Sequence, residues 1–210
     1  MTASERPFGD PFGTAASLPE ELWQDLLLRP PSEAAAATGA RWEGGRFKLT
    51  FLARVYALDP VARRVWELKD PGRDMDFQTG LVLLSSLGRA KDIPPAGRMV
   101  TPRELPGGSL FFRGPHAMPL GRLCKCFGRD PASLLARAAE LGGRSLPGAD
   151  AAAAFAALPR VPVYIFLWSQ DDEFPARATL CLDAHAHFHL ALDGLWALAS
   201  VLVRRLTGEL

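Results

Sequence analysis

Three adjacent carboxylates, Asp171-Asp172-Glu173, follow the apolar segment that ends at Trp168. Neighbouring carboxylates repel one another unless a cation, a basic residue or water neutralises their charge. At the end of a buried strand they could bind a hard metal ion or serve as a general base. The alternative is a solvated hairpin loop, because acidic side chains favour the surface in any case. The composition favours the loop and leaves the metal-binding interpretation open.

Histidines occupy every second position of a short segment near the C-terminus, at His185, His187 and His189. An extended chain would place all three on one face with Cys181 and Asp183. Imidazole, thiolate and carboxylate are the usual donors to zinc and other transition metals, so this row is a candidate metal site. In a helix only His185 and His189 would meet. A partly exposed turn without metal is the remaining alternative, since a row of donors alone does not define a site.

The remaining histidine, His116, ends the motif Phe111-Phe112-Arg113-Gly114-Pro115-His116. Two aromatic rings, a guanidinium and an imidazole in a loop constrained by glycine and proline suit an aromatic or anionic ligand. The alternative is a loop that covers the core and uses its phenylalanines to fill a hole. The motif is therefore a second candidate binding element.

We predict that this motif and the loop after Trp168 line one shared pocket. Arg113 and His116 would then pair with carboxylates of a ligand. Trp168 would supply a flat apolar wall, and Asp172 and Glu173 would orient Arg113 or a polar group of the ligand. The prediction depends on two segments that are distant in the sequence folding together.

The cysteines offer a weaker signal. Cys124-Lys125-Cys126 falls in an expected helix over 120–127, where the two thiols diverge and joint metal binding is disfavoured. Three cysteines are too few for a disulfide scaffold or a four-thiolate iron–sulfur cluster, and they favour a reducing compartment. The sequence also lacks glycine-rich nucleotide loops and a Gly-x-Ser-x-Gly elbow, so a serine-type triad is unsupported.

Charge and hydropathy narrow the class of partner. The 210 residues carry 24 basic and 23 acidic side chains, a formal net charge of +1. A protein that neutralises phosphates usually has a larger basic excess, so we expect no nucleic-acid partner. The longest apolar run near the C-terminus, 194–203, is about half a bilayer span, and residues 1–16 lack the apolar stretch of a secretory signal. We therefore expect a cytoplasmic protein without a membrane partner.

The helices and strands expected from the sequence would position these residues. Together they indicate a single α+β domain over 17–210, with a mainly antiparallel sheet packed by several helices. Alternating apolar residues predict an antiparallel meander over 46–68. An apolar run over 161–168 predicts a central strand, with an antiparallel partner over 178–182.

Capping signals and apolar spacing predict the helices. Ser17 and Glu20 form a capping box for the first helix, which ends near Leu28 before a proline pair. Asp193 is expected to cap the last helix. The other expected helices cover 33–38, a segment from Asp74 or Asp76 to Leu87, 120–127, a segment opened by Asp130-Pro131, and the alanine-rich run 151–158.

Residues 1–16 contain a doubled Pro-Phe-Gly unit and are expected to form a flexible N-terminal arm. The alternative is an arm whose Phe8 and Phe12 dock on the body of the protein or on a partner.

Four segments resemble a known family. They are Thr101-Pro102-Arg103-Glu104-Leu105-Pro106-Gly107-Gly108, the Phe111–His116 motif, Leu158-Pro159-Arg160-Val161-Pro162, and Trp168 with Asp171-Asp172-Glu173-Phe174-Pro175-Ala176. The family is the bacterial and archaeal Domain of Unknown Function 3786, and the similarity runs from about Ala40 to Leu206. In its most specific part, Asp172 stands where a glutamate is usual.

The resemblance implies a redox or metallocofactor context, because some relatives carry an iron–sulfur segment beside this domain and the family is common in anaerobes. This chain lacks the cysteine-rich segment and would not hold such a cluster itself. The family implies no catalytic residue and no identified cofactor.

Three functional hypotheses follow. The leading one is a non-enzymatic cytoplasmic binding domain for a small cofactor-like ligand or for a redox or metalloenzyme partner. The second is a metal-dependent hydrolase, in which the acidic loop or the histidine row holds an ion that activates water. The third is a structural or interaction subunit that engages a partner through Phe8 and Phe12.

Overall fold

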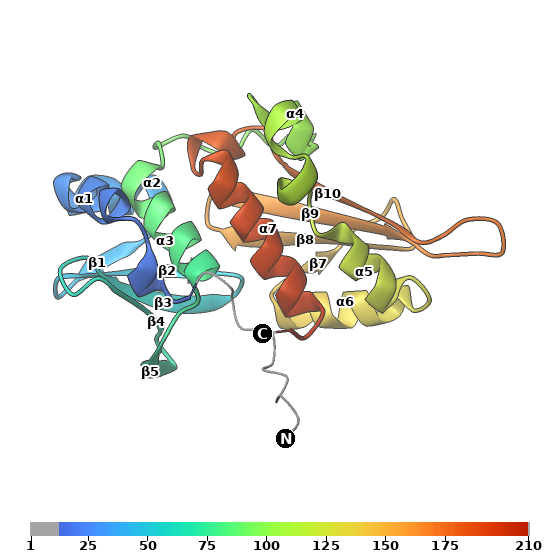
Figure 1. The fold of residues 1–210 in the computed structure, drawn as a ribbon, viewed down its shortest axis with the longest axis horizontal. Helices are drawn as coiled ribbons and strands as arrows, with labels where there is room; N and C mark the ends of the chain where they lie inside the picture. Colours follow the sequence, from blue (N-terminus) through green and yellow to red (C-terminus); the bar gives the residue numbers. More distant parts are fainter. Residues whose placement is uncertain (1–12, 210) are drawn as a thin grey trace, which may run out of the picture.

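A computed structural model describes residues 13–209. Over this part of the chain, seven α-helices accompany two antiparallel sheets of five strands each. The α+β class and the antiparallel pairing predicted from the sequence are confirmed, although the strands divide between two sheets. The helices lie across one side of both sheets, and α7 runs between the two halves (Figure 1).

The first sheet is a meander in which each strand pairs with its neighbour in the sequence. Its strands are β1 (Arg41–Glu43), β2 (Arg46–Phe51), β3 (Arg54–Asp59), β4 (Arg64–Glu67) and β5 (Asp70–Asp74). In β2 the buried residues Phe47, Leu49 and Phe51 alternate with more exposed ones, as the period-two pattern predicts.

Three helices cover this half: α1 (Glu20–Leu28), α2 (Pro31–Thr38) and α3 (Phe77–Arg89). Asp76 caps α3, because its carboxylate accepts a bond from the Thr79 amide at 3.1 Å. The expected capping box at α1 is wrong: Pro19 is the N-cap, and Ser17 belongs to a short 3-10 turn. Gly39 ends α2 with φ of +73°, a left-handed conformation that glycine adopts without strain.

The second sheet has the order β6-β10-β9-β8-β7, so β9 is central, as its apolar sequence predicts. Its strands are β6 (Met99–Val100), β7 (Arg144–Ser145), β8 (Ala151–Leu158), β9 (Val161–Trp168) and β10 (Arg177–Asp183). The predicted alanine helix is wrong, because those residues form β8. Strand pairing with β9 and packing against α6 override the helix preference of alanine, whose small side chain permits close packing.

The remaining helices are α4 (Gly108–Phe111), α5 (Leu120–Phe127), α6 (Pro131–Glu140) and α7 (Leu192–Leu206). Asp130 caps α6 as predicted. Asp193 does not cap α7: Ala191 is the N-cap, and Asp193 lies inside the first turn.

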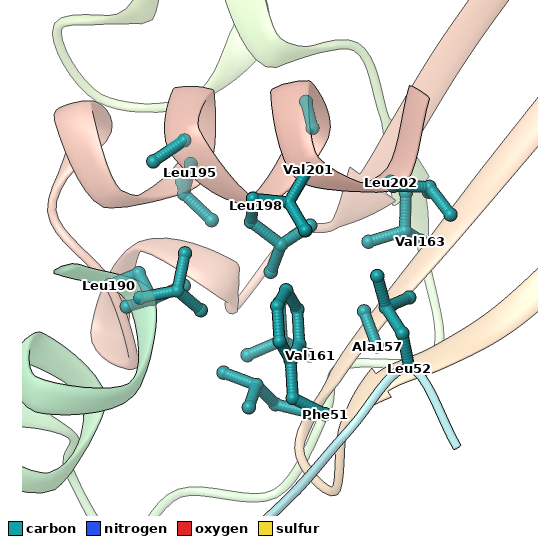
Figure 2. Packing of buried hydrophobic residues seen from close by; sticks show 14 of the residues in the cluster. Phe51, Leu52, Ala157, Val161, Val163, Leu190, Leu195, Leu198, Val201 and Leu202 are labelled. Atoms are coloured by element: carbon teal, nitrogen blue, oxygen red, sulfur yellow. The ribbon is translucent and has the colours of Figure 1, made fainter. Parts of the chain in front are cut away.

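The two halves share one core beneath α7. Phe51 at the end of β2 and Leu52 in the β2–β3 turn meet Ala157 and Val161 from the second sheet, and the buried side of α7 closes over them (Figure 2). The Leu52 amide donates to the Ala157 carbonyl at 2.9 Å, which links the β2–β3 turn to β8. This shared core fixes the position of α7 relative to both sheets.

The structure describes only part of the expected N-terminal arm. Phe8 and Phe12 lie outside the described residues. In the described part of the expected arm, Ala15 is buried and its amide donates to the Met75 carbonyl.

None of the helices in residues 13–209 combines the length and apolar character needed to cross a membrane.

Candidate ligand-binding cleft

A cleft of about 420 Å³ lies between α1, α3, α7 and the 3-10 turn Gly114–His116. Helix α3 packs against both α1 and α7, so it forms the floor between them. The cleft is lined by Pro19, Glu21, Leu22, Phe77, Gln78, Leu81, Arg89, His116, Asp193, Trp196 and Ala197. Its volume falls in the range of small-molecule sites, and its lining mixes apolar side chains with a few polar groups.

Aromatic rings form one end of the cleft. The imidazole of His116 stacks on Phe111, with ring centroids 4.5 Å apart and planes 24° apart. The same imidazole meets Trp196 edge to face, with centroids 5.8 Å apart. Trp196 Nε1 donates to the Ala117 carbonyl at 3.3 Å, which ties the turn to α7. These contacts orient two rings beside the cleft before any ligand arrives.

The charged groups of the cleft differ in whether a partner already neutralises them. Arg89 donates to Asp25 Oδ2 through Nε at 2.9 Å and through a terminal nitrogen at 2.7 Å. Glu21 and Asp193 are exposed, and neither forms an ion pair within the described chain. Among residues 13–209, the partner of Asp193 Oδ1 is the Gly194 amide, which donates to it at 2.8 Å. The unpaired charge that a ligand would meet is therefore negative.

Of the five predicted ligand-binding residues, only His116 lines this cleft. Arg113 precedes it in the turn, with an exposed side chain that is not part of the lining. The sequence motif therefore marks one wall of a cavity, but its partners come from helices and not from the acidic loop.

The acidic loop forms the tip of the β9–β10 hairpin, which projects from the far end of the second sheet (Figure 1). Trp168 stacks on Phe166, and the Arg177 guanidinium lies 4.4 Å from its ring. Asp171 Oδ1 accepts from the amides of Phe174 and Glu173, and these bonds lower the pKa of Asp171 below its ordinary value. The loop geometry is thus explained locally, as in a solvated turn.

The structure does not form the predicted shared pocket. Asp172 and Glu173 are exposed at the hairpin tip, whereas His116 contacts Trp196 on α7. No hydrogen bond, ion pair or ring contact in residues 13–209 joins the two loops. The error arose because sequence alone does not show how far a long hairpin carries its tip from the core.

The three C-terminal histidines lie in and around a 3-10 turn, Ala186–Phe188, and not on an extended strand. His185 Nδ1 is 2.9 Å from the Pro94 carbonyl, and the His187 ring packs on Phe188. His189 is buried, with 2 % of its surface exposed. Among the described residues, no group of three or more His, Cys, Asp or Glu is arranged to hold a metal ion. The expected row on one face is therefore not formed.

Asp183 explains why the strand stops before the histidines. Its buried carboxylate accepts bonds of 2.8 Å from the amides of Ala96, Gly97 and His185. The last of these bonds turns the chain back on itself immediately after β10. Burial by itself would raise the pKa of Asp183, but the three amide donors outweigh it and hold that pKa below its ordinary value. Asp183 therefore anchors the turn that follows β10.

His189 gives the stability of the fold a dependence on pH. Neither ring nitrogen of His189 has a hydrogen-bond partner in the described part of the chain, and the adjoining cavity of about 10 Å³ has room for about one water molecule. Burial, and then the nearby Arg160 guanidinium, lower the pKa of His189 below its ordinary 6.5. As pH falls below 6.5, the unfolded chain takes up a proton that the folded chain resists, so folding stability decreases.

We expect the free energy of unfolding to fall as pH decreases below 6.5, with a contribution of at most about 1.4 kcal/mol per pH unit from His189. His189→Leu should flatten this slope, because the replacement cannot be protonated. Urea unfolding at several pH values measures it, with the exposed His116→Leu as a matched control. An unchanged slope in His189→Leu would contradict the assignment.

Two of the three cysteines lie in surroundings that disfavour activation of their thiols. Burial raises the pKa of Cys124 and of Cys181, which disfavours the nucleophilic thiolate in both. Cys126 is exposed and makes no disulfide. These positions fit the expectation of unpaired, incidental cysteines.

The sequence missed Trp196, Glu21 and Arg89 as residues of a site. The spacing of Trp196 matches that of the apolar residues around it and so favours a place on the buried face of the last helix. Its proximity to Asp193, one turn earlier, was the available signal. No sequence signal indicated that α1 and α3 contribute to the cleft, because their contribution depends on how three helices pack.

Fold and cleft together define a two-sheet α+β domain with a small-molecule-sized cleft between its helices. The chain belongs to the family described as Domain of unknown function (DUF3786), whose model matches residues 30–205. The resemblance found in the sequence is thus confirmed. Comparison with curated proteins finds no significant match. Comparison with solved structures likewise finds none.

Proposed function

We propose that this member of the DUF3786 family is a non-enzymatic binding protein that takes a small organic ligand into the cleft between α1, α3 and α7. The observation that carries the proposal is the preorganised pair of rings, His116 and Trp196, beside a cavity of about 420 Å³. Ring orientation is already fixed by the Phe111 stack and by the Ala117 carbonyl, so binding needs little ordering of side chains.

The lining favours binding over catalysis. His116 is the one imidazole among the described lining residues, and the set contains no serine, threonine, cysteine or lysine beside it. A hydroxyl, thiol or amine nucleophile activated by a neighbouring base is therefore absent from the described lining. The apolar side chains of Leu22, Leu81 and Ala197 instead supply surface that an organic molecule can bury.

A fragment screen followed by amide and indole NMR tests the proposal. We expect shift changes confined to the cleft, and we expect Trp196→Leu to weaken the best fragment about tenfold or more, because it removes the main aromatic wall. Trp168→Leu is the matched control, since Trp168 belongs to the pocket predicted from sequence and lies outside the cleft. Shifts centred on Trp168, or no binding at all, would overturn the proposal.

A further inference from the structure

The cleft contains unpaired negative charge on two of its helices. Glu21 lies in the first turn of α1 and Asp193 in the first turn of α7. The positive end of each helix dipole stabilises a carboxylate at such a position. Both side chains line the cleft and are without an ion-pair partner in the described chain. A ligand entering the cleft therefore meets two carboxylates.

The cations near the cleft do not offset this charge. Arg89 is held by two bonds to a single oxygen of Asp25, which neutralises its guanidinium. Arg113, to which the sequence analysis assigned the carboxylates of a ligand, is not part of the lining. An anionic ligand would have to displace Asp25 from Arg89 or approach Glu21 and Asp193 unpaired, and both are unfavourable.

The aromatic end of the cleft is also suited to a cation. Trp196 and the His116 imidazole stand nearly perpendicular, at 85°, and both border the cavity. The indole face attracts a positive charge within about 6 Å of its centroid, more strongly than other aromatic faces do. An alkylated ammonium presents apolar methyl groups to such a ring and its charge to the nearby carboxylates.

We propose that the cleft selects an organic cation, an alkylated ammonium, over a neutral molecule of the same shape and over small anions. The inference rests on the proposed function and specifies the ligand class. The sequence analysis expected an anionic ligand, whereas this proposal specifies a cationic one. The reason is that the charged residues that line the cavity come from α1 and α7 and not from the Arg113 turn.

Choline and its neutral isostere 3,3-dimethyl-1-butanol test the proposal directly, with butyrate as a small anion. The indole resonance of Trp196, assigned by its loss in Trp196→Phe, reports binding to the full chain. We expect choline to bind about tenfold more tightly than the alcohol at low salt, butyrate to bind least, and the difference to shrink as salt is added.

Charge-neutralising variants provide the second arm. Asp193→Asn and Glu21→Gln should each weaken choline about threefold to tenfold and leave the neutral alcohol unchanged. Glu20→Gln is the matched control, because Glu20 neighbours Glu21 but pairs with Arg63 and does not line the cleft. Asp193→Asn retains the oxygen that accepts from the Gly194 amide, so the start of α7 is preserved.

The outcomes separate the two proposals. Equal affinity for choline and the alcohol, or tighter binding of butyrate, would overturn the cation class and leave the cleft as a binding site. If other fragments bind in the cleft but choline does not, the cation class is likewise overturned and the cleft remains a binding site. Absence of any ligand from the cleft would overturn both the class and the proposed function.

Discussion

Phe51→Ala is expected to lower the free energy of unfolding by about 3–5 kcal/mol. Phe51 is fully buried at the end of β2, where it contacts the core shared by both sheets and α7 (Figure 2). Removing the ring leaves a cavity that two sheets and a helix cannot close together. The guanidinium of Arg205, 5.2 Å from the ring centroid and itself buried, also loses its aromatic neighbour.

Chemical denaturation followed by circular dichroism measures this loss. Val61→Ala is the control, because Val61 is 81 % exposed in the turn after β3 and should change stability by less than about 0.5 kcal/mol. If the two variants were equally stable, the junction between the sheets would not be the centre of the core.

Asp183→Ala is the second change with a large expected effect, a loss of about 3 kcal/mol or more. The substitution removes the shared acceptor of the Ala96, Gly97 and His185 amides, and a hydrogen bond to a charged group contributes about 1.5–3 kcal/mol. The carboxylate itself is completely buried, so its removal takes away the anchor of the turn after β10. Thermal unfolding should show a clearly lowered midpoint.

The free energy of unfolding at low pH tests the same three hydrogen bonds to Asp183. The pKa of Asp183 is held below 3.8, so its contribution is present above that pH and is lost as pH falls further. Asp183→Ala should lack this loss. Asp172→Ala, at the exposed hairpin tip, is the control and should be nearly neutral. A comparable destabilisation by Asp172→Ala would contradict the structural account of both residues.

Local patterns were sufficient where one strand or one cap decided the structure. The alternation of Phe47, Leu49 and Phe51 predicted β2, and the Asp130-Pro131 pair predicted the start of α6. The apolar run of β9 predicted a central strand, and the sheet order confirms it, although the buried residues of β9 alternate with half-buried ones. These features depend on residues near one another in the sequence.

Tertiary contacts decided the elements that sequence analysis got wrong. The alanines of β8 favour a helix in isolation, yet hydrogen bonding to β9 and packing against α6 make them a strand. Histidines alternate with other residues in this segment, as in a strand. The hydrogen bond from the His185 amide to the Asp183 carboxylate nevertheless bends the segment into a turn. In both cases a specific hydrogen-bonding partner outweighs the local preference.

The candidate site was predictable only in part, for the same reason. His116 stood out by its type and its constrained loop, and it does line the cleft. The remaining walls depend on how α1 and α7 pack against α3, which no spacing within one helix specifies. Pairing His116 with the acidic loop joined two conspicuous segments that the fold keeps apart.

The most direct test of the central claim is an intermolecular nuclear Overhauser experiment on the complex with the tightest-binding probe. The account predicts contacts from the methyl or ring protons of the probe to the Trp196 indole and the His116 imidazole. Contacts to Trp168 alone, or to surfaces away from α1, α3 and α7, would show that the cleft is not the binding site.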